Sequence, residues 1–441
     1  MELALMGAGE AAAAIRGGLI TSEALVNACL EQIDRLEEQV QAWAHLDPEL
    51  ALEKARAADQ ALQAGNMLGP LHGVPVGVKD IIDTIDMPTE NGTVLYRGRQ
   101  PQDNATVITR LQEAGAIILG KTVTTELAVY APGKTRNPHD LSRTPGGSSS
   151  GSAAAVASGM VPIAIGTQTN GSVIRPASFC GVYGFKPTFG QVSRHLVLKQ
   201  SPPLDQIGVF ARSVGDAALV AEAIIGFDSN DLATRPMAKA PLFTVQSEEP
   251  PVPPRLACVK TPVWEQADEG TRFAFTELAQ ALGEHALEAD LPDIFVTAHE
   301  QHRIIMEADL ARSFEREYTD GREKLSAVLL EMLERGRRVL AMDYNNAVAD
   351  ISSLYEGFDK IFEWHDAIIT PATIGEAPVG LESTGSPVFC TIWTLCGMPA
   401  ITLPLLQGEN GMPLGIQLVG PRGDDARLLR TARWLVNEMS Q

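Results

Sequence analysis

Two glycine- and serine-rich segments stand at the centre of this sequence, PGGSSSGSAAAVASG at residues 145–159 and GTQTNGSVIRPASFCGVYGFKPT at residues 166–188. The small residues of SAAAVASG predict a helix, and the apolar run VPIAI that follows predicts a strand against which this helix packs. Glycines stand directly before Ser148 and Ser172, where they permit backbone conformations closed to larger residues and leave room beside the main chain. The segments therefore place two serines in tight turns between buried elements.

Short apolar runs alternate with helical patterns on both sides of this centre. VPVGVKDII, AIILGKT and VPIAIGT are typical of strands, and DAIITP, PAITLPL and GIQLVG predict three more buried strands towards the C-terminus. Residues 298–355 have a helical period, and DDARLLRTARWLVNEM predicts a last helix. This alternation indicates an α/β fold with a large central mixed, mainly parallel β-sheet covered by helices on both faces.

The same patterns suggest one domain over residues 1–441 with four parts. Residues 1–65 read as a helical part, in which Thr21 or Ser22 and then Asp47 have the side chains that cap helix N-termini. Residues 66–225 form the core around the two serines. Residues 230–254, which end in EEPPVPP, predict a surface excursion or linker. Residues 255–441 would complete the sheet and a pocket.

Composition and charge exclude several functional classes. The formal net charge of −20 at pH 7 would repel nucleic acid and anionic lipid. The first 25 residues contain no long apolar run, so we expect neither a membrane segment nor a secretion signal, and a cytoplasmic location. The five cysteines are scattered, as expected of reduced, buried side chains, and no histidine has metal-ligand spacing, so no metal is expected.

Two short motif matches are misleading in their context. GAIILGKT at 115–122 fits the phosphate-binding loop, but its apolar middle predicts a buried strand followed by a surface lysine, Lys121. GSSSG at 147–151 fits the nucleophile elbow that would make Ser149 a nucleophile, but the polar stretch NPHDLSRTPG precedes it instead of a buried strand. Neither motif is expected to carry chemistry.

Lys79 lies in the apolar run VGVKDII. A solvated lysine has a pKa of about 10.4 and is a poor base at neutral pH, whereas burial lowers that pKa. A value of about 7 to 8 would cost roughly 3 to 5 kcal/mol, which only a buried site can impose. Asp80 would oppose this shift, but alternation along a strand points it to the opposite face.

Lys79 and the two serine-rich segments together closely resemble the signature of the amidase signature family. The lysine and the two segments come in the family's order, and the separation of 24 positions from Ser148 to Ser172 agrees with its spacing. The resemblance continues through PVGLESTGSPVFCTIWTLCGMPAITLPL and so covers nearly the whole chain.

The resemblance implies a serine amidohydrolase in which Lys79 acts through Ser148, placed after a cis peptide bond, to activate the nucleophile Ser172. The backbone N–H groups of Thr169, Asn170, Gly171 and Ser172 would form the oxyanion hole. The expected substrate is a small carboxamide, anilide, carbamate or ureido compound, cleaved through an acyl-enzyme without any cofactor, and esterase activity is expected on the side. Two alternatives stay open. The chain could be an amidotransferase or glutaminase-type subunit that works with a partner protein, or it could be a non-catalytic scaffold of the same fold. A homodimer is also possible.

Two features depart from the family's pattern. Gln168 and Asn170 stand where many relatives have aspartate and glycine, and Arg175 falls three residues after the nucleophile. Arg175 could bind a substrate carboxylate, although a structural guanidinium bonded to loop carbonyls is the commoner arrangement. Further residues lie in segments that resemble the family's pocket walls, with a place in the core as the alternative for the tryptophan; they are Thr124, Tyr130, Trp393 and Thr394.

Overall fold

The fold is built on a single sheet of eleven strands in a computed structural model that describes residues 3–66 and 69–440. The strand order is β1-β3-β2-β4-β6-β5-β10-β11-β9-β7-β8. The strands are β1 (Trp43–Leu46), β2 (Pro75–Lys79), β3 (Ile117–Thr122), β4 (Ile163–Gln168), β5 (Tyr183–Lys186), β6 (Gln206–Ala211), β7 (Leu256–Val259), β8 (Ala286–Ala289), β9 (Ala367–Pro371), β10 (Ala400–Gln407) and β11 (Pro413–Val419). All six strands predicted from the apolar runs are present.

The sheet is mixed, as predicted, but it is not mainly parallel. Six of the ten pairings are antiparallel and four are parallel. Parallel pairs join β3, β2 and β4 at one end and β9, β7 and β8 at the other, while all pairings between β4 and β9 are antiparallel. The central strands do not follow a strand-helix-strand pattern: β10 and β11 form a hairpin, and no α-helix separates β5 from β6. Parallel pairing requires a crossover connection.

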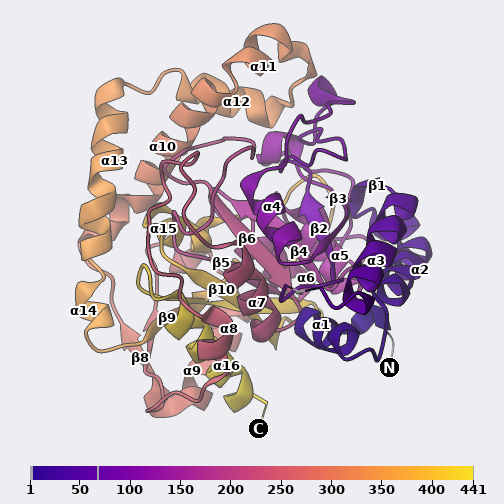
Figure 1. Ribbon diagram of the computed structural model, residues 1–441. Coiled ribbons are helices and arrows are strands. Elements are labelled where there is room, and N and C mark those ends of the chain that lie inside the picture. Colours follow the sequence, from indigo (N-terminus) through magenta and orange to yellow (C-terminus); the bar gives the residue numbers. More distant parts are fainter. Residues whose placement is uncertain (1–2, 67–68, 441) are drawn as a thin grey trace.

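Helices cover both faces of the sheet (Figure 1). On one face lie α5 (Ser150–Ala157) and α6 (Ile174–Cys180), directly above a strip of strand glycines. A Cβ on Gly166 would stand 2.6 Å from Ser149 Oγ, and one on Gly208 would stand 2.6 Å from Val173 Cγ2. The missing side chains thus let both helices approach the sheet closely. On the other face α4 (Thr106–Glu113), α7 (Val214–Ile224) and α16 (Asp425–Glu438) pack together.

The N-terminal helices α1 (Ala8–Arg16), α2 (Ser22–Val40) and α3 (Pro48–Gln63) lie at one end of the sheet (Figure 1). Thr21 caps α2 by accepting from the N–H of Ala24, and Asp47 caps α3 by accepting from the N–H of Leu50. The part expected to be helical also contributes the edge strand β1, which pairs with β3. The predicted surface excursion contains α8 (Leu242–Ser247), which packs against α7 and α16.

A second helical group follows β8 and surrounds a separate hydrophobic cluster at the opposite end of the molecule from α2 and α3 (Figure 1). The prediction of helices over 298–355 is confirmed. The helices of this group are α10 (Ala298–Ser313), α11 (Glu315–Asp320), α12 (Ala327–Gly336), α13 (Ala341–Glu356), α14 (Asp359–Phe362) and α15 (Val388–Leu395), whereas α9 (Glu269–Leu282) precedes β8. Across the described ranges, no helix combines the length and the apolar character that crossing a bilayer requires.

The segment that fits the phosphate-binding loop is the buried strand β3, as predicted, but Lys121 is not a surface lysine. Its side chain is fully buried and forms an ion pair with Asp80 at 3.5 Å. Every residue of β3 is buried, and the carboxylate compensates the ammonium charge there. Ser149 is also buried and bonds to the backbone of Thr167. All five cysteines are free and buried, which confirms their expected place in the core.

Candidate active site

Lys79 ends β2 with a fully buried side chain. Its Nζ lies 2.7 Å from Ser148 Oγ and 2.8 Å from Thr167 Oγ1. Burial holds the pKa of Lys79 well below its usual range, while the negative charge of Asp205 acts in the opposite direction. Burial of this kind favours the uncharged amine, which can accept a proton from the hydroxyl beside it.

Asp80 does not pair with Lys79. Its side chain takes Lys121 as its partner, in keeping with the alternation expected along the strand. Burial raises the pKa of Asp80 to about 6 and lowers the pKa of Lys121 to about 8. The complication foreseen from the sequence is therefore absent, because Asp80 makes its ion pair away from Lys79.

Ser148 follows a cis peptide bond from Gly147, the feature that the resemblance implied. The carbonyl oxygen of Gly147 accepts a hydrogen bond of 2.7 Å from Nη2 of Arg175, which also donates to Thr384 Oγ1. The Arg175 guanidinium is buried, and its Nε and Nη1 have no partner among the described residues. The geometry thus corresponds to a guanidinium bonded to a loop carbonyl, and carboxylate binding by Arg175 stays a prediction.

Gln168 supports the loop that carries Ser172. Its Oε1 accepts from the N–H groups of Val173 and Ile174, at 2.8 and 3.0 Å, and its Nε2 donates to Thr394 Oγ1. These N–H groups belong to the first turn of α6, where a helix leaves donors unpaired. The amide thus caps α6 without bringing a negative charge into the site.

Asn170 fixes the middle of the same loop. Its Nδ2 donates to the hydroxyl of Tyr130 at 3.1 Å, and its Oδ1 accepts from Thr391 Oγ1 at 2.8 Å. Its carbonyl oxygen accepts from Thr394 Oγ1 at 2.5 Å. Tyr130 and Thr394, both predicted as pocket residues, therefore hold the loop beside Ser172. Thr391 does so as well, although no motif in the sequence pointed to it.

The loop leaves a row of backbone donors available. In residues 3–66 and 69–440, no acceptor is found for the N–H groups of Thr169, Asn170, Gly171 and Ser172. These residues are buried or nearly so, and Ser172 is 9% exposed. Unpaired N–H groups in a buried loop are costly unless a ligand accepts from them. No direct hydrogen bond links Ser148 to Ser172 within these ranges. The loop that carries Ser172 follows β4, and Thr167 of β4 contacts Nζ of Lys79.

The remaining predicted pocket residues are buried. Trp393 belongs to the cluster around α15, with its ring centroid 5.5 Å from that of Phe358, and only 1% of its surface is exposed. Thr124 is buried, and its hydroxyl has no partner within the described ranges. A role for either residue in substrate binding stays a prediction.

Comparison with known proteins decides the family. The family model described as Amidase matches residues 24–429. The chain belongs to the Amidase family. It is 34% identical to a subunit of the glutamyl-tRNA(Gln) amidotransferase of Chloroflexus aggregans, over 97% of this chain and 95% of the relative.

Solved structures of the family share the fold. A chain described as part of a vestigial protein complex that reveals the evolutionary origins of an s-triazine catabolic enzyme is 27% identical, with a TM-score of 0.92 and 98% of each chain covered. The peptide amidase from Stenotrophomonas maltophilia is 29% identical, with a TM-score of 0.85 over 99% of this chain and 97% of that one. Enzymes that act on C–N bonds are thus built on this fold.

Two residues near Lys79 were not foreseen. Thr167 offers it a second hydroxyl, and Asp205, just before β6, has a half-buried carboxylate that accepts from Thr169 Oγ1 at 2.7 Å. The signals were weak, because Thr167 reads as one more residue of the strand VPIAIGT and Asp205 as a polar turn residue in SPPLDQIG. Thr167, Thr169 and Asp205 all line one cavity of about 1100 Å³.

Proposed function

We propose that this member of the Amidase family hydrolyses the C–N bond of a small carboxamide, anilide, carbamate or ureido substrate through a seryl acyl-enzyme. Ser172 is the nucleophile, Lys79 the base, and Ser148 the hydroxyl that passes the proton between them. The unpaired N–H groups of the loop 169–172 bind the oxyanion. No cofactor takes part in these steps.

In the proposed reaction, uncharged Lys79 accepts the proton of Ser148 as Ser148 accepts the proton of Ser172. The Ser172 oxygen forms a bond to the substrate carbonyl carbon, and the negative charge that develops on the carbonyl oxygen is stabilised by the loop N–H groups. When the C–N bond breaks, the proton returns through Ser148 to the departing nitrogen. Water then cleaves the ester to Ser172 with the same groups in reversed order.

One observation carries this proposal, the 2.7 Å contact between a fully buried Lys79 and Ser148. A buried ammonium without a carboxylate in contact is costly, whereas a buried amine beside two hydroxyls is satisfied and basic. The short contact also places the amine within reach of direct proton transfer.

A second candidate is an amidotransferase component that releases ammonia for a partner protein. It is favoured by the 34% identity to the glutamyl-tRNA(Gln) amidotransferase chain, which covers both proteins almost completely. The two candidates share the chemistry at Ser172 and differ in substrate and partner. Ammonia release from glutamine by the isolated chain, measured beside a panel of small amides, carbamates and ureas, separates them.

The decisive test of chemistry is labelling with a fluorophosphonate. We expect one adduct, located on Ser172 by peptide mass spectrometry and absent from Ser172→Ala. A folded wild-type protein that forms no adduct would favour the non-catalytic scaffold and reject both enzymatic candidates.

The substrate class is tested with matched amides, anilides, carbamates, ureas and esters, with Ser172→Ala as the blank. Esters are expected to be cleaved as a side reaction, because an ester needs less help at its leaving group than an amide. Turnover of glutamine alone would move the assignment to the amidotransferase component.

Two further predictions concern the oligomeric state and the location. Light scattering tests the homodimer, and cell fractionation tests the cytoplasmic location.

A further inference from the structure

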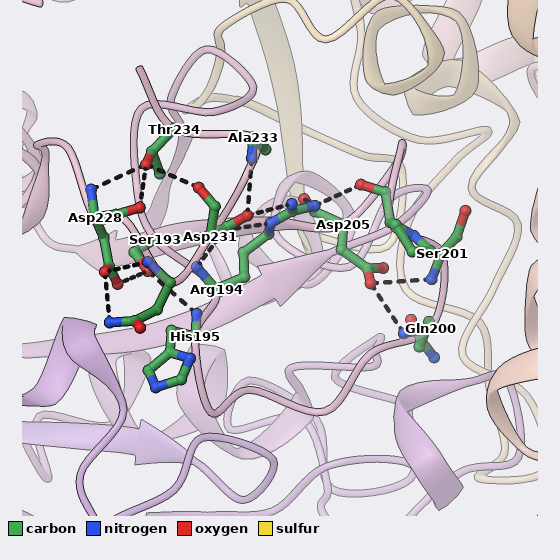
Figure 2. A network of polar contacts seen from close by, with 12 residues as sticks. Ser193, Arg194, His195, Gln200, Ser201, Asp205, Asp228, Asp231, Ala233 and Thr234 are labelled. Carbon is green, nitrogen blue, oxygen red and sulfur yellow. Dashed lines mark hydrogen bonds and ion pairs between the residues drawn. The ribbon is translucent and has the colours of Figure 1, made fainter. Parts of the chain in front are cut away.

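A polar network on the loop before β6 surrounds Asp205 (Figure 2). Its carboxylate accepts from the backbone N–H groups of Gln200 and Ser201, at 2.9 and 3.0 Å, and from the hydroxyl of Thr169 at 2.7 Å. Three donors fix the orientation of the carboxylate, and one of them belongs to the loop that carries the proposed oxyanion donors. These contacts hold the Asp205 carboxylate in one orientation, although Asp205 is not itself a catalytic residue.

Arg194 lies between Asp231 and Asp205 in this network, as Figure 2 shows. Its Nε and Nη2 bind both oxygens of Asp231, at 2.9 and 2.8 Å, and its Nη1 donates to the carbonyl oxygen of Asp205. A bidentate pair of this kind holds the guanidinium in one place. The loops 193–205 and 228–234 are thereby fastened together around Asp205.

The sheet brings Asp205 close to Lys79. Gln206, the next residue, pairs with Gln168 across β6 and β4, so Asp205 lies where β4 ends. Thr167 at that end is a partner of Lys79, and it lines the same cavity as Asp205. The negative charge of Asp205 raises the pKa of Lys79 and so opposes the effect of burial. Gln168, which ends β4 beside Thr167, is uncharged.

We propose that Asp205 is a positioning residue whose negative charge sets the pH at which Lys79 becomes an active base. The inference rests on the proposed function of Lys79. A negative charge at this place stabilises the ammonium form of Lys79 and so opposes the effect of burial. Asp205 thus keeps the amine able to hold the proton that it takes from Ser148 and must return to the leaving nitrogen.

Other charges around this group are accounted for. On α10, His302 contacts the carbonyl oxygen of Thr169 and is uncharged at neutral pH, because burial lowers its pKa to about 4. Asp309 of the same helix bonds to Ser201, and Arg312 lines the same cavity. From the loop 193–205 come Arg194, bound to Asp231, His195, which lines the same cavity, and the exposed Lys199. Asp80 and Lys121 pair with each other.

The test is the pH dependence of fluorophosphonate labelling at Ser172, which requires uncharged Lys79 and therefore rises with pH through the pKa of that lysine. Removing the charge in Asp205→Asn should lower this pKa, so the rising limb should move to lower pH by about one unit or more. Asp205→Glu, which keeps the charge, should place the limb near that of the wild type. Thermal melts establish that each variant is folded.

Asp231→Asn is the matched control, since it removes a buried carboxylate from the same network without removing the charge beside β4. The rising limb of the labelling profile of Asp231→Asn should stay at the pH of the wild-type limb. A folded Asp205→Asn protein with the wild-type limb, or an equal displacement in Asp231→Asn, would overturn the inference while leaving the proposed function intact. No labelling of the wild type would instead reject the proposed function. If Asp205→Asn does not fold, Asp205→Ser provides the same comparison with a smaller side chain.

Discussion

Lys79 and Ser148 are 69 residues apart, yet their side chains meet at 2.7 Å because two separate supports converge. β2 fixes the lysine between β3 and β4. The serine stands before α5, which lies on the glycine strip of the same sheet. The contact therefore depends on how closely α5 approaches the strands, and a change at the strip can separate Lys79 from Ser148 without replacing either residue.

Gly166→Ala should separate this pair. The added Cβ would stand 2.6 Å from Ser149 Oγ and 2.7 Å from the ring of Phe210, so α5 must move outward. We expect a loss of about 1 to 3 kcal/mol in the free energy of unfolding and a fall in kcat of about 10- to 100-fold. Urea titration and amide turnover measure the two effects.

Gly215→Ala provides the control for that experiment. The site lies in α7, and the nearest atom to an added Cβ is 3.5 Å away, an ordinary contact. Alanine in a helix should raise stability by up to about 1 kcal/mol and leave kcat unchanged. Wild-type activity in Gly166→Ala would show that the approach of α5 does not control the pair.

The adjacent serines Ser148 and Ser149 should differ sharply. Ser148→Ala removes the hydroxyl next to Lys79 and should lower amide turnover by about 1000-fold or more. Ser149→Ala removes only hydrogen bonds to the backbone of Thr167, so a loss of about 1 kcal/mol in stability is expected, with kcat within a few-fold of the wild type. Equal losses of turnover in both variants would contradict the relay.

Local signals in the sequence were enough for the elements and for the burial of Lys79. Capping by Thr21 and Asp47 and the apolar runs of the strands depend on neighbouring residues, and both predictions are confirmed. The direction of the central strands depends on which distant strands pair. The prediction of a mainly parallel sheet was wrong because all the central pairings are antiparallel. Lys121 was misplaced for the same reason, because its partner Asp80 is distant in the chain.

The residues that support the site could not be predicted from the sequence. Thr391 contacts Asn170 across 221 positions, and Asp205 reaches Thr169 across 36. Each of these residues looks ordinary where it stands in the chain. What makes them important is the ladder between β4 and β6 and the packing of α15 over the loop, which no short motif records.

Arg175→Ala should lower kcat by about 10- to 100-fold for every substrate, acidic or neutral. The reason is the lost hydrogen bond to the carbonyl of Gly147, which holds the backbone at Ser148. Arg212→Ala is the control, since this arginine also donates to backbone carbonyls, those of Val161 and Met6, far from the site. It should lose stability but not kcat. A KM that rises only for acidic substrates in Arg175→Ala would instead indicate carboxylate binding.

Lys186 should make stability depend on pH. Its Nζ is fully buried and donates to Gln206 Oε1 and to the carbonyl of Met398, and burial lowers its pKa to about 7. The unfolded chain, with a lysine pKa of about 10.4, binds more protons than the folded chain between these values. The free energy of unfolding should therefore rise with pH from about 7 to about 10, by up to about 1.4 kcal/mol per pH unit from this group.

Lys186→Met should reduce that slope, whatever it does to the absolute stability. Some slope should remain, because burial also lowers the pKa values of Lys79 and Lys121. Lys260→Met is the control, since Lys260 is exposed and pairs with Glu288 at the surface, and it should leave the slope unchanged. Urea titrations of the three proteins at about pH 7, 8 and 9 decide the matter. An identical slope in Lys186→Met would mean that Lys186 is protonated in the folded protein over this whole range.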